Sequence, residues 1–319
     1  MLNGSHPVMG SDPFPLLRSF WNATVPRREW THHAHIRVAT FIVRTFGQAL
    51  AHELLRAKIR TLNAALGGPA AAYHETVTHA WTVILDAALR DRPIDASLAH
   101  ECDEMVETVG QGNHLGEYYS APALTDRRAR NGFARPDLRP LPKPVGLHIR
   151  SAAVGEGPHA ASVVREVYDE YGFTWDEGGY HADLVHIESH YLSTGDIFLV
   201  AVDTDGTLVG TAALKRFAAL PGEQGWVGVN GVRRIAGADG SVERLYVRPR
   251  ARRCGIGRAL LSRITDVGRV YGMRRLEIWS DKRFQEAHRL YRSLGADIVS
   301  SRICGDPDQS PEWGLRLNL

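Results

Sequence analysis

The sequence has few cysteines, little net charge and no long apolar run. Cys102, Cys254 and Cys304 are widely spaced and odd in number, which argues against a disulfide framework and for a reducing compartment. The formal net charge of +2 is too small to indicate a nucleic-acid partner. No apolar run approaches the roughly 18 residues of a membrane span, and the N-terminus lacks a secretion pattern. We therefore expect a cytoplasmic protein that binds neither nucleic acid nor a membrane.

Length and composition are those of a globular protein with room for two domains. The chain has 319 residues, of which 44% are hydrophobic and 23% charged. Residues 136–144 contain four prolines and cannot sustain a helix or a central strand, so they mark a boundary. We predict a flexible arm over residues 1–12, an all-α domain over 13–140, a proline-rich linker over 141–146 and an α/β domain over 147–319.

The two halves differ in their hydrophobic periodicity. Between Trp30 and Arg90 apolar residues recur at three- to five-residue steps, which is typical of a helix bundle. From Leu147 onward, segments with strand and helix patterns alternate. The elements expected there are strands over 148–154, 197–202 and 208–217, a helix over 160–171, and a glycine-rich insertion over 218–240.

The most informative stretch runs from Val242 to Leu261, where a strand-like segment leads into an arginine- and glycine-rich loop that opens an amphipathic helix. Gly255 and Gly257 remove side chains that would keep an anion from the backbone. The first-turn amides and the helix dipole direct positive charge at the same place. This pattern indicates a pyrophosphate-binding loop. Its mobile cations are Arg252, Arg253 and Arg258.

The loop resembles that of the GNAT superfamily of acetyl-CoA-dependent N-acyltransferases. Arg252, Gly255 and Gly257 match its Arg/Gln-x-x-Gly-x-Gly/Ala signature, whereas no βαβ repeat follows that would support a Rossmann fold. Residues 274–280 look like the family's fifth strand, and residues 283–295 like the helix after it. The resemblance covers residues 146–319. It implies a mixed, mostly antiparallel sheet flanked by helices, with acetyl-CoA as the donor.

The resemblance also implies the residues of the reaction. Tyr291 stands at the family's acid position, and a buried structural tyrosine is the alternative. Glu243 stands where a carboxylate often deprotonates the amine, and a strand glutamate paired with Arg244 or Arg274 is the alternative. Strand backbone would hold the pantetheine and polarise the acetyl carbonyl. The implied acetyl-CoA residues are Leu245, Tyr246, Val247, Arg252, Arg253, Cys254, Gly255, Ile256, Gly257, Arg258 and Ala259.

Two positions depart from the commonest family pattern. Many members carry Gly where Arg253 stands and Asn where Phe284 stands. The first change leaves both loop glycines intact, and the second removes a polar group that often steadies the site. His288, on the helix of Tyr291, is expected at the surface.

The acceptor is expected to be a small-molecule amine. Residues 168–176 and 180–184 resemble the acceptor loop of members that act on small amines or amino acids, and their aromatic and acidic residues suit a cation. The alternative is an amphipathic hairpin whose aromatics are core. The acceptor residues predicted are Tyr171, Trp175, Asp176, Tyr180 and Asp183.

Strands of family members often pair across a dimer, so a homodimer is one expectation. The alternative is that the helical half covers this edge of the sheet.

The N-terminal half resembles a small, helical, uncharacterised bacterial family. The resemblance rests on a Trp-Thr-His-x-Ala-His motif at residues 30–35 and a Tyr-His-Glu-Thr motif at 73–76, and it supplies no activity. Helical spacing places His33 on a solvated face and the other motif histidines on apolar stripes. They would converge as metal ligands or, as we favour, remain neutral histidines bonded to threonines. The candidate ligands are His32, His35, His74 and Glu75.

Three functions follow. The main prediction is an N-acetyltransferase that transfers the acetyl group directly to a small amine, with the helical half as a substrate or regulatory module. The second is a bifunctional enzyme whose helical half carries a metal-assisted step. The third is a non-catalytic acyl-CoA-binding protein, which the departures at Arg253 and Phe284 motivate.

Overall fold

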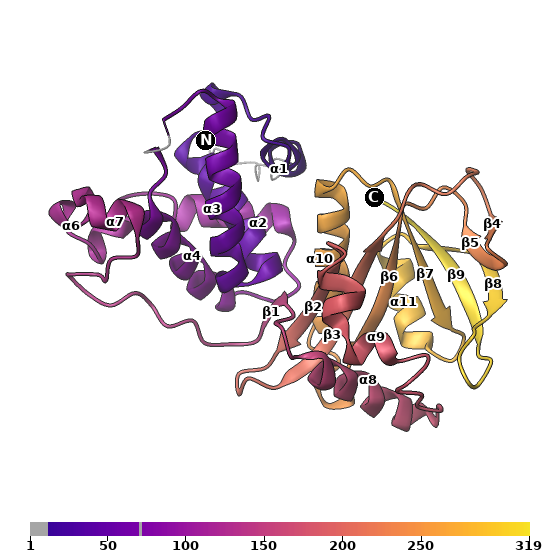
Figure 1. The fold of residues 1–319 in the computed structure, drawn as a ribbon. Helices are drawn as coiled ribbons and strands as arrows, with labels where there is room; N and C mark the ends of the chain where they lie inside the picture. The colour runs from indigo at the N-terminus through magenta and orange to yellow at the C-terminus, as the bar shows by residue number, and fades with distance from the viewer. Residues whose placement is uncertain (1–11, 70–71) are drawn as a thin grey trace, which may run out of the picture. The chain divides into compact units, whose positions relative to one another are not determined.

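The computed structural model describes residues 12–69 and 72–319 and divides into two compact units (Figure 1). The first unit contains the chain up to Arg92 together with Ala96–Pro144. The second contains Pro93–Asp95 and Val145–Leu319. The predicted arm over residues 1–12 lies, except for Asp12, outside the described residues. No helix in the described ranges is both long enough and apolar enough to cross a membrane.

The first unit is helical, as predicted. Helix α2 is its centre: Val38 and Ile42 are fully buried, and the helix contacts α3, α4 and α5. Gly47, with φ of +79°, separates α2 from α3 in a conformation that L side chains rarely adopt. The elements are α1 (Phe14–Trp21), η1 (Arg27–Glu29), α2 (His32–Phe46), α3 (Gln48–Ala65), α4 (Glu75–Arg90), α5 (Leu98–Thr108), η3 (His114–Glu117), α6 (Ala121–Thr125) and α7 (Arg127–Asn131).

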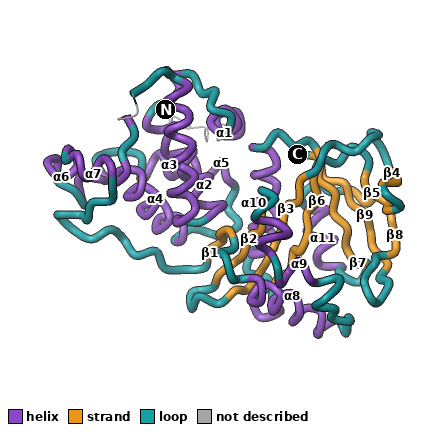
Figure 2. The backbone as a smooth tube through the Cα atoms, in the orientation of Figure 1, coloured by secondary structure: helices purple, strands orange, loops and turns teal. Residues whose placement is uncertain are grey.

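The second unit is built on a seven-stranded sheet with the order β1-β2-β3-β6-β7-β9-β8, whose strands are orange in Figure 2. Within this sheet β6 and β7 are parallel and every other neighbouring pair is antiparallel. This mixed sheet with flanking helices confirms the predicted fold class. The strands are β1 (His148–Ser151), β2 (Ile197–Val202), β3 (Leu208–Arg216), β6 (Gly240–Val247), β7 (Arg275–Asp281), β8 (Asp297–Ile303) and β9 (Pro311–Asn318).

Helices cover both faces of this sheet. Every residue of β2 is buried, so side chains on both faces of this strand are covered. Phe198 and Val200 join a core cluster with α8 and α9, while the intervening Leu199 points to the opposite face, where α10 contacts β2. The helical elements are α8 (Gly157–Tyr171), α9 (Ala182–Val185), the π-turn η4 (Glu188–Leu192), η5 (Pro249–Ala251), α10 (Ile256–Val270) and α11 (Gln285–Ser293).

The insertion over 218–240 contains a two-stranded hairpin that the sequence analysis missed. Strands β4 (Trp226–Val229) and β5 (Val232–Ile235) are joined by Asn230 and Gly231, whose φ angles are +48° and +77°. Two successive left-handed residues suit a tight hairpin turn. The hairpin is held to the main sheet, because the Arg234 guanidinium and the Ile235 amide both donate to Glu277 on β7.

Strand β6 carries the irregularity that opens the sheet. Its pairing with β3 shifts register between Thr211 and Ala213, and Arg244 in the bulge has φ of +52°. The Thr211 hydroxyl donates to the Arg244 carbonyl at 2.7 Å, which satisfies a backbone group that the bulge removes from the ladder. On its other edge β6 pairs with β7 only over Gly240–Val242. From Glu243 onward the two parallel strands are therefore apart.

Replacing the bulge hydroxyl tests this arrangement. Thr211→Val keeps the side-chain shape but leaves the Arg244 carbonyl without its donor, so the free energy of unfolding should fall by about 1–3 kcal/mol. Urea denaturation of the full chain measures the change. Thr204→Val, in an exposed turn, is the control and should be near neutral. Equal stability of the two variants would contradict the role given to Thr211.

Candidate active site

A cleft of about 1040 Å³ lies where β6 leaves β7. Its walls come from β6, β7, the ends of β8 and β9, the C-terminal turn of α8, the first turn of α10 and helix α11. Val232 and Arg234 of the hairpin also line it. The volume is that of a site for a large ligand.

One end of the cleft is the first turn of α10. Gly255 caps the helix in the left-handed conformation, with φ of +79°, and the next amides have no partner within the helix. A Cβ added to Gly257 would meet only Leu290 and Val247, at 3.5 and 3.8 Å, which are ordinary contacts. Packing therefore does not require glycine at position 257. Gly255, Ile256 and Gly257 line the cleft, so an anionic ligand bound there would meet these amides.

The arginines of this loop are not equivalent. Arg252 forms a bidentate pair with Glu170, at 2.8 and 2.6 Å, and donates to the Val247 carbonyl at 3.1 Å, so it fixes the loop. Arg253 is exposed and has φ of +68°, which explains why glycine is common at this place in the resembling family. Arg258 is partly buried and donates to the Ser293 hydroxyl at 3.2 Å.

The remaining loop residues are divided between surface and core. Cys254 is exposed, and its thiol lies 3.6 Å from the Arg252 carbonyl. Ile256 and Ala259 are buried and anchor the first turn of α10. The strand residues Leu245, Tyr246 and Val247 line the cleft along the edge of β6 that β7 has left. Backbone groups on that edge are available to a ligand.

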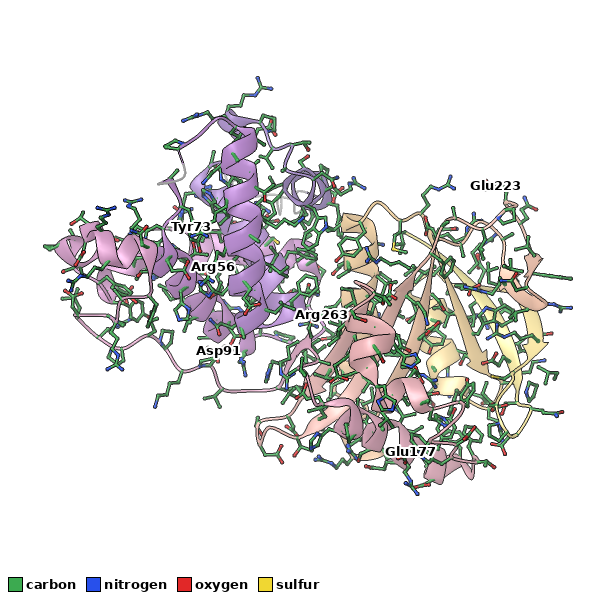
Figure 3. All side chains as sticks on the ribbon, viewed as in Figure 1. Arg56, Tyr73, Asp91, Glu177, Glu223 and Arg263 are labelled. Atoms are coloured by element: carbon green, nitrogen blue, oxygen red, sulfur yellow. The ribbon has the colours of Figure 1, made fainter. Side chains whose placement is uncertain are left out.

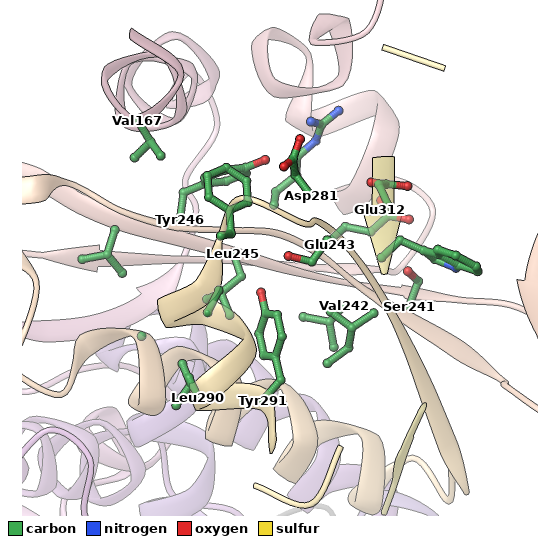
Figure 4. Close-up of a pocket in the computed structure, with 18 of the residues that line it drawn as sticks. Val167, Ser241, Val242, Glu243, Leu245, Tyr246, Asp281, Leu290, Tyr291 and Glu312 are labelled. Carbon is green, nitrogen blue, oxygen red and sulfur yellow. The ribbon is translucent and has the colours of Figure 1, made fainter. Parts of the chain in front are cut away.

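Tyr291 and Glu243 line the same cleft. Figure 4 shows Tyr291 rising from α11 on one side of β6, Asp281 and Glu312 on the other side, and Glu243 between them. Tyr291 is 4% exposed, and burial raises the pKa of its hydroxyl, which stays protonated at neutral pH. Burial also raises the pKa of the Glu243 carboxyl, while the positive charges of Lys215 and Arg244 lower it.

Glu243 is not an ion-pair partner of Arg244. The Arg244 guanidinium instead donates to both oxygens of Asp183, at 2.9 and 2.7 Å, and to the Tyr180 carbonyl at 2.8 Å. Among the described residues, neither Arg244 nor Arg274 forms an ion pair with Glu243. The alternative interpretation of Glu243 as a paired strand glutamate is therefore wrong.

The structure corrects the predicted acceptor residues. Tyr171 and Tyr180 line the cleft, but the other three do not. Asp183 is neutralised by Arg244, and Asp176 accepts hydrogen bonds from the Gly179 and Tyr180 amides at 3.0 and 2.9 Å. Trp175 stacks on His181, with ring centroids 4.1 Å apart. The charge of Asp183 is therefore already compensated, and the Asp176 carboxylate caps the turn outside the cleft lining.

Several cleft residues were missed or misplaced. Phe284 packs against Tyr171 and Phe173, with ring centroids 4.8 and 5.5 Å apart, so it joins α11 to the end of α8 through aromatic contact. His288, expected at the surface, is buried, and its Nε2 lies 3.2 Å from the Ser280 hydroxyl. Further lining residues that the sequence analysis did not assign to the site are Lys215, Arg234, Glu277, Trp279, Cys304 and Glu312.

The three motif histidines of α2 differ in their exposure to solvent. His32 is exposed, which corrects its predicted place on the apolar stripe, and His33 is exposed as predicted. His35 is half-buried against Trp30, with ring centroids 3.9 Å apart. Burial, with a smaller effect of His32, lowers the pKa of His35 to about 4, so this imidazole is neutral.

His74 and Glu75 have structural partners. His74 precedes α4 rather than lying on its stripe: its Nδ1 accepts from the Val77 amide at 3.3 Å, and its Nε2 lies 2.8 Å from the Leu124 carbonyl. Glu75 pairs with Arg56, which Figure 3 labels beside Tyr73, and contacts His52 at 3.1 Å. In the described ranges no three His, Cys, Asp or Glu side chains converge as a metal-binding group.

Comparison with known proteins gives one family. Residues 161–296 match the family model described as the acetyltransferase (GNAT) family. No curated protein matches the sequence. Solved structures that resemble part of the chain include a GNAT-family acetyltransferase from Staphylococcus aureus Mu50, at 17% identity with a TM-score of 0.42, covering 54% of this chain and 99% of that one.

Two further structures show similar values. A GCN5-related N-acetyltransferase from Kribbella flavida has 20% identity and a TM-score of 0.41, covering 55% of this chain and 98% of its own. A ribosomal-protein-alanine N-acetyltransferase from Brucella melitensis has 19% identity and a TM-score of 0.41, covering 54% of this chain and 99% of its own.

Gly257 provides a test of ligand binding at the first turn of α10. Because an added Cβ meets only ordinary contacts and alanine favours the helix over glycine, Gly257→Ala should not lower the unfolding midpoint, but it adds a methyl group to the wall of the cleft. Affinity for coenzyme A, measured by calorimetry, should fall about tenfold, equivalent to about 1.4 kcal/mol. Gly228→Ala, which meets no atom within 4 Å, is the control. Unchanged affinity in Gly257→Ala would refute this placement of the anion.

Proposed function

Residues 161–296 are a segment of the acetyltransferase (GNAT) family, and from this premise we propose that the protein transfers an acetyl group from acetyl-CoA directly to the amine of a small molecule. The observation that carries the proposal is that the Tyr291 and Glu243 side chains line one cleft at the opening of β6 and β7. An acid and a base with a gap between them are what direct acyl transfer needs.

The residues at the start of α10 fit the pyrophosphate of the donor. The amides of the first turn, which line the cleft together with Gly257, and the nearby guanidinium groups of Arg253 and Arg258 would bind it. Acetyl-CoA would supply a thioester, whose acetyl carbon accepts the amine and whose sulfur departs. Backbone groups of Leu245, Tyr246 and Val247 would hold the pantetheine and stabilise negative charge on the carbonyl oxygen.

Glu243 would accept the amine proton. An amine is a nucleophile only when it is neutral, so the site needs a base whose pKa lies closer to neutrality than that of an exposed carboxylate. Burial raises the pKa of Glu243 in this direction. The proton would pass to the carboxylate directly or through one water.

Tyr291 would donate a proton to the departing sulfur. As the bond between the acetyl carbon and the amine nitrogen forms, the carbon–sulfur bond breaks, and the thiolate takes up one proton. Burial keeps the Tyr291 hydroxyl protonated, as a donor must be before the reaction. In this proposal the helical unit serves as a substrate or regulatory module.

Tyr291→Phe tests the acid. With the hydroxyl removed, kcat should fall about 10²-fold or more, since positioned proton transfer contributes about 10²–10⁴-fold. Affinity for acetyl-CoA should be retained, because the ring still fills its place. Thiol release with a panel of amines gives the rate. Tyr271→Phe, a tyrosine outside the cleft, is the matched control. Full activity in Tyr291→Phe would remove Tyr291 from the mechanism.

Glu243→Gln tests the base through pH. In the wild type, kcat/KM should decline as the pH falls through a pKa above the usual glutamate value of 4.5, because the protonated carboxyl cannot accept a proton. Glu243→Gln should lower the rate and abolish this limb. Glu286→Gln, on the cleft rim, should keep it. The assignment of Glu243 as the base would be contradicted if the decline of kcat/KM at low pH follows only the pKa of the acceptor amine and persists in Glu243→Gln.

A further inference from the structure

Most charged side chains on the side of the cleft lined by the β4–β5 hairpin, β7, β8 and β9, which we call the acceptor side, already have partners of opposite charge. Arginines from the hairpin, from β8 and from the segment before α11 each hold a carboxylate at hydrogen-bond distance. Asp306 keeps its charge, but its two oxygens accept from the Ser310 amide and hydroxyl at 2.7 and 2.6 Å, which uses part of its accepting capacity within the loop. A ligand charge gains little from groups that are already neutralised. The three pairs are Arg234–Glu277 at 2.6 Å, Arg302–Glu312 at 2.7 Å and Arg283–Asp281 at 2.7 Å.

Lys215 and Glu243 differ from these pairs. Both line the cleft, and no ion pair joins either one to another described residue. The Lys215 ammonium lies over the Tyr191 ring, 5.6 Å from its centroid. The Tyr191 hydroxyl lies 3.3 Å from Glu243 but only 2.6 Å from Asp183, and it has one proton to donate. Glu243 therefore keeps most of its accepting capacity for a ligand.

Strand pairing places these two groups side by side on one face. Lys215 on β3 is directly opposite Ser241 on β6, and Glu243 is two residues further along β6. Residues two apart on a strand share a face, and such diagonal neighbours are about 7–8 Å apart. One carboxylate and one ammonium thus face the cleft with space for a small group between them.

We propose that the acceptor is an amino acid, whose amine meets Glu243 and whose carboxylate meets Lys215. This inference rests on the proposed function and names its substrate class. A zwitterion of this kind complements both unpaired charges at once. A simple amine leaves the Lys215 ammonium unpaired, and a diamine brings a second positive charge against it.

Arg216, the cation next to Lys215 in the sequence, is a poorer partner for the carboxylate of the acceptor. Arg216 is exposed, donates to the Gly195 carbonyl, and lies 3.7 Å from an oxygen of Asp196. Lys215 is partly buried, so a carboxylate bound there is more shielded from water, which strengthens the ion pair. The transfer itself is unchanged: the nitrogen–acetyl bond forms, the carbon–sulfur bond breaks, Glu243 takes the amine proton and Tyr291 supplies one to sulfur.

Matched pairs of acceptors test the proposal. Each pair contains an amino acid and the amine that lacks only its carboxylate, such as phenylalanine with phenethylamine, leucine with 3-methylbutylamine and glutamate with 4-aminobutyrate. Thiol release from acetyl-CoA gives kcat/KM for each. The wild type should prefer at least one amino acid over its partner amine by about tenfold or more, chiefly through KM, which corresponds to about 1.4 kcal/mol.

Substitution of Lys215 assigns the preference to its charge. Lys215→Met should reduce the preference to near unity, Lys215→Arg should retain much of it, and the adjacent Arg216→Met should leave it as in the wild type. Because the ammonium lowers the pKa of Glu243, Lys215→Met should also move the acid limb of kcat/KM to higher pH, so the comparison is made on the plateau.

The outcomes separate two failures. Equal rates for both members of every reactive pair, or a preference that survives Lys215→Met, would overturn the amino-acid proposal while leaving acetyl transfer intact. If none of the amines gives thiol release from acetyl-CoA, the proposed function fails. In that case calorimetric binding of the same pairs, with coenzyme A present, still decides the proposal: binding of an amino acid that is lost in Lys215→Met supports it, and no such binding refutes it.

Discussion

The separation of β6 from β7 after Val242 is the constraint on which the site depends. It is maintained by the bulge at Arg244, where the left-handed backbone of a non-glycine residue costs about 1–3 kcal/mol. Two interactions offset this cost: the Thr211 hydroxyl satisfies the Arg244 carbonyl, and Asp183 holds the Arg244 guanidinium. Asp183 comes from α9, so the same ion pair that stabilises the bulge also fixes the helix pair α8–α9 above the cleft. Removing either partner would leave a largely buried charge without compensation.

The two departures from the commonest family pattern have different physical meanings. Arg253 occupies a left-handed position that glycine adopts without steric cost, so the chain accepts backbone strain and gains a cation beside the first turn of α10. Phe284 replaces a polar contact by aromatic packing that reaches across to Tyr171 and Phe173. Neither change touches the carboxyl of Glu243 or the hydroxyl of Tyr291. They alter how the walls of the cleft are held, and they do not favour a non-catalytic protein.

Local patterns predicted the framework, and long-range contacts decided the site. The strand over 197–202 and the helices near 157–171 and 256–270 follow from periodicity and glycine placement, which are local properties. The β4–β5 hairpin was missed although Asn230-Gly231 between valines is a strong turn signal. Asp183 was misassigned because its partner Arg244 lies 61 residues away, and His288 because its burial depends on Ser280 from a neighbouring strand. The position of a residue around its own helix does not reveal partners that come from distant segments.

Selectivity in this cleft follows from which charges the fold leaves without a partner. Arginine forms geometrically fixed pairs with carboxylates. Each carboxylate that an arginine holds near the acceptor side is therefore unavailable to a ligand, although the sequence alone suggests that it is free. Lysine is a compact point charge on a flexible stem, and Lys215 has no carboxylate within pairing distance in the described part of the chain. The abundance of acidic residues around the cleft therefore says little about the acceptor's charge. The register of β3 against β6, which sets Lys215 beside Glu243, says more.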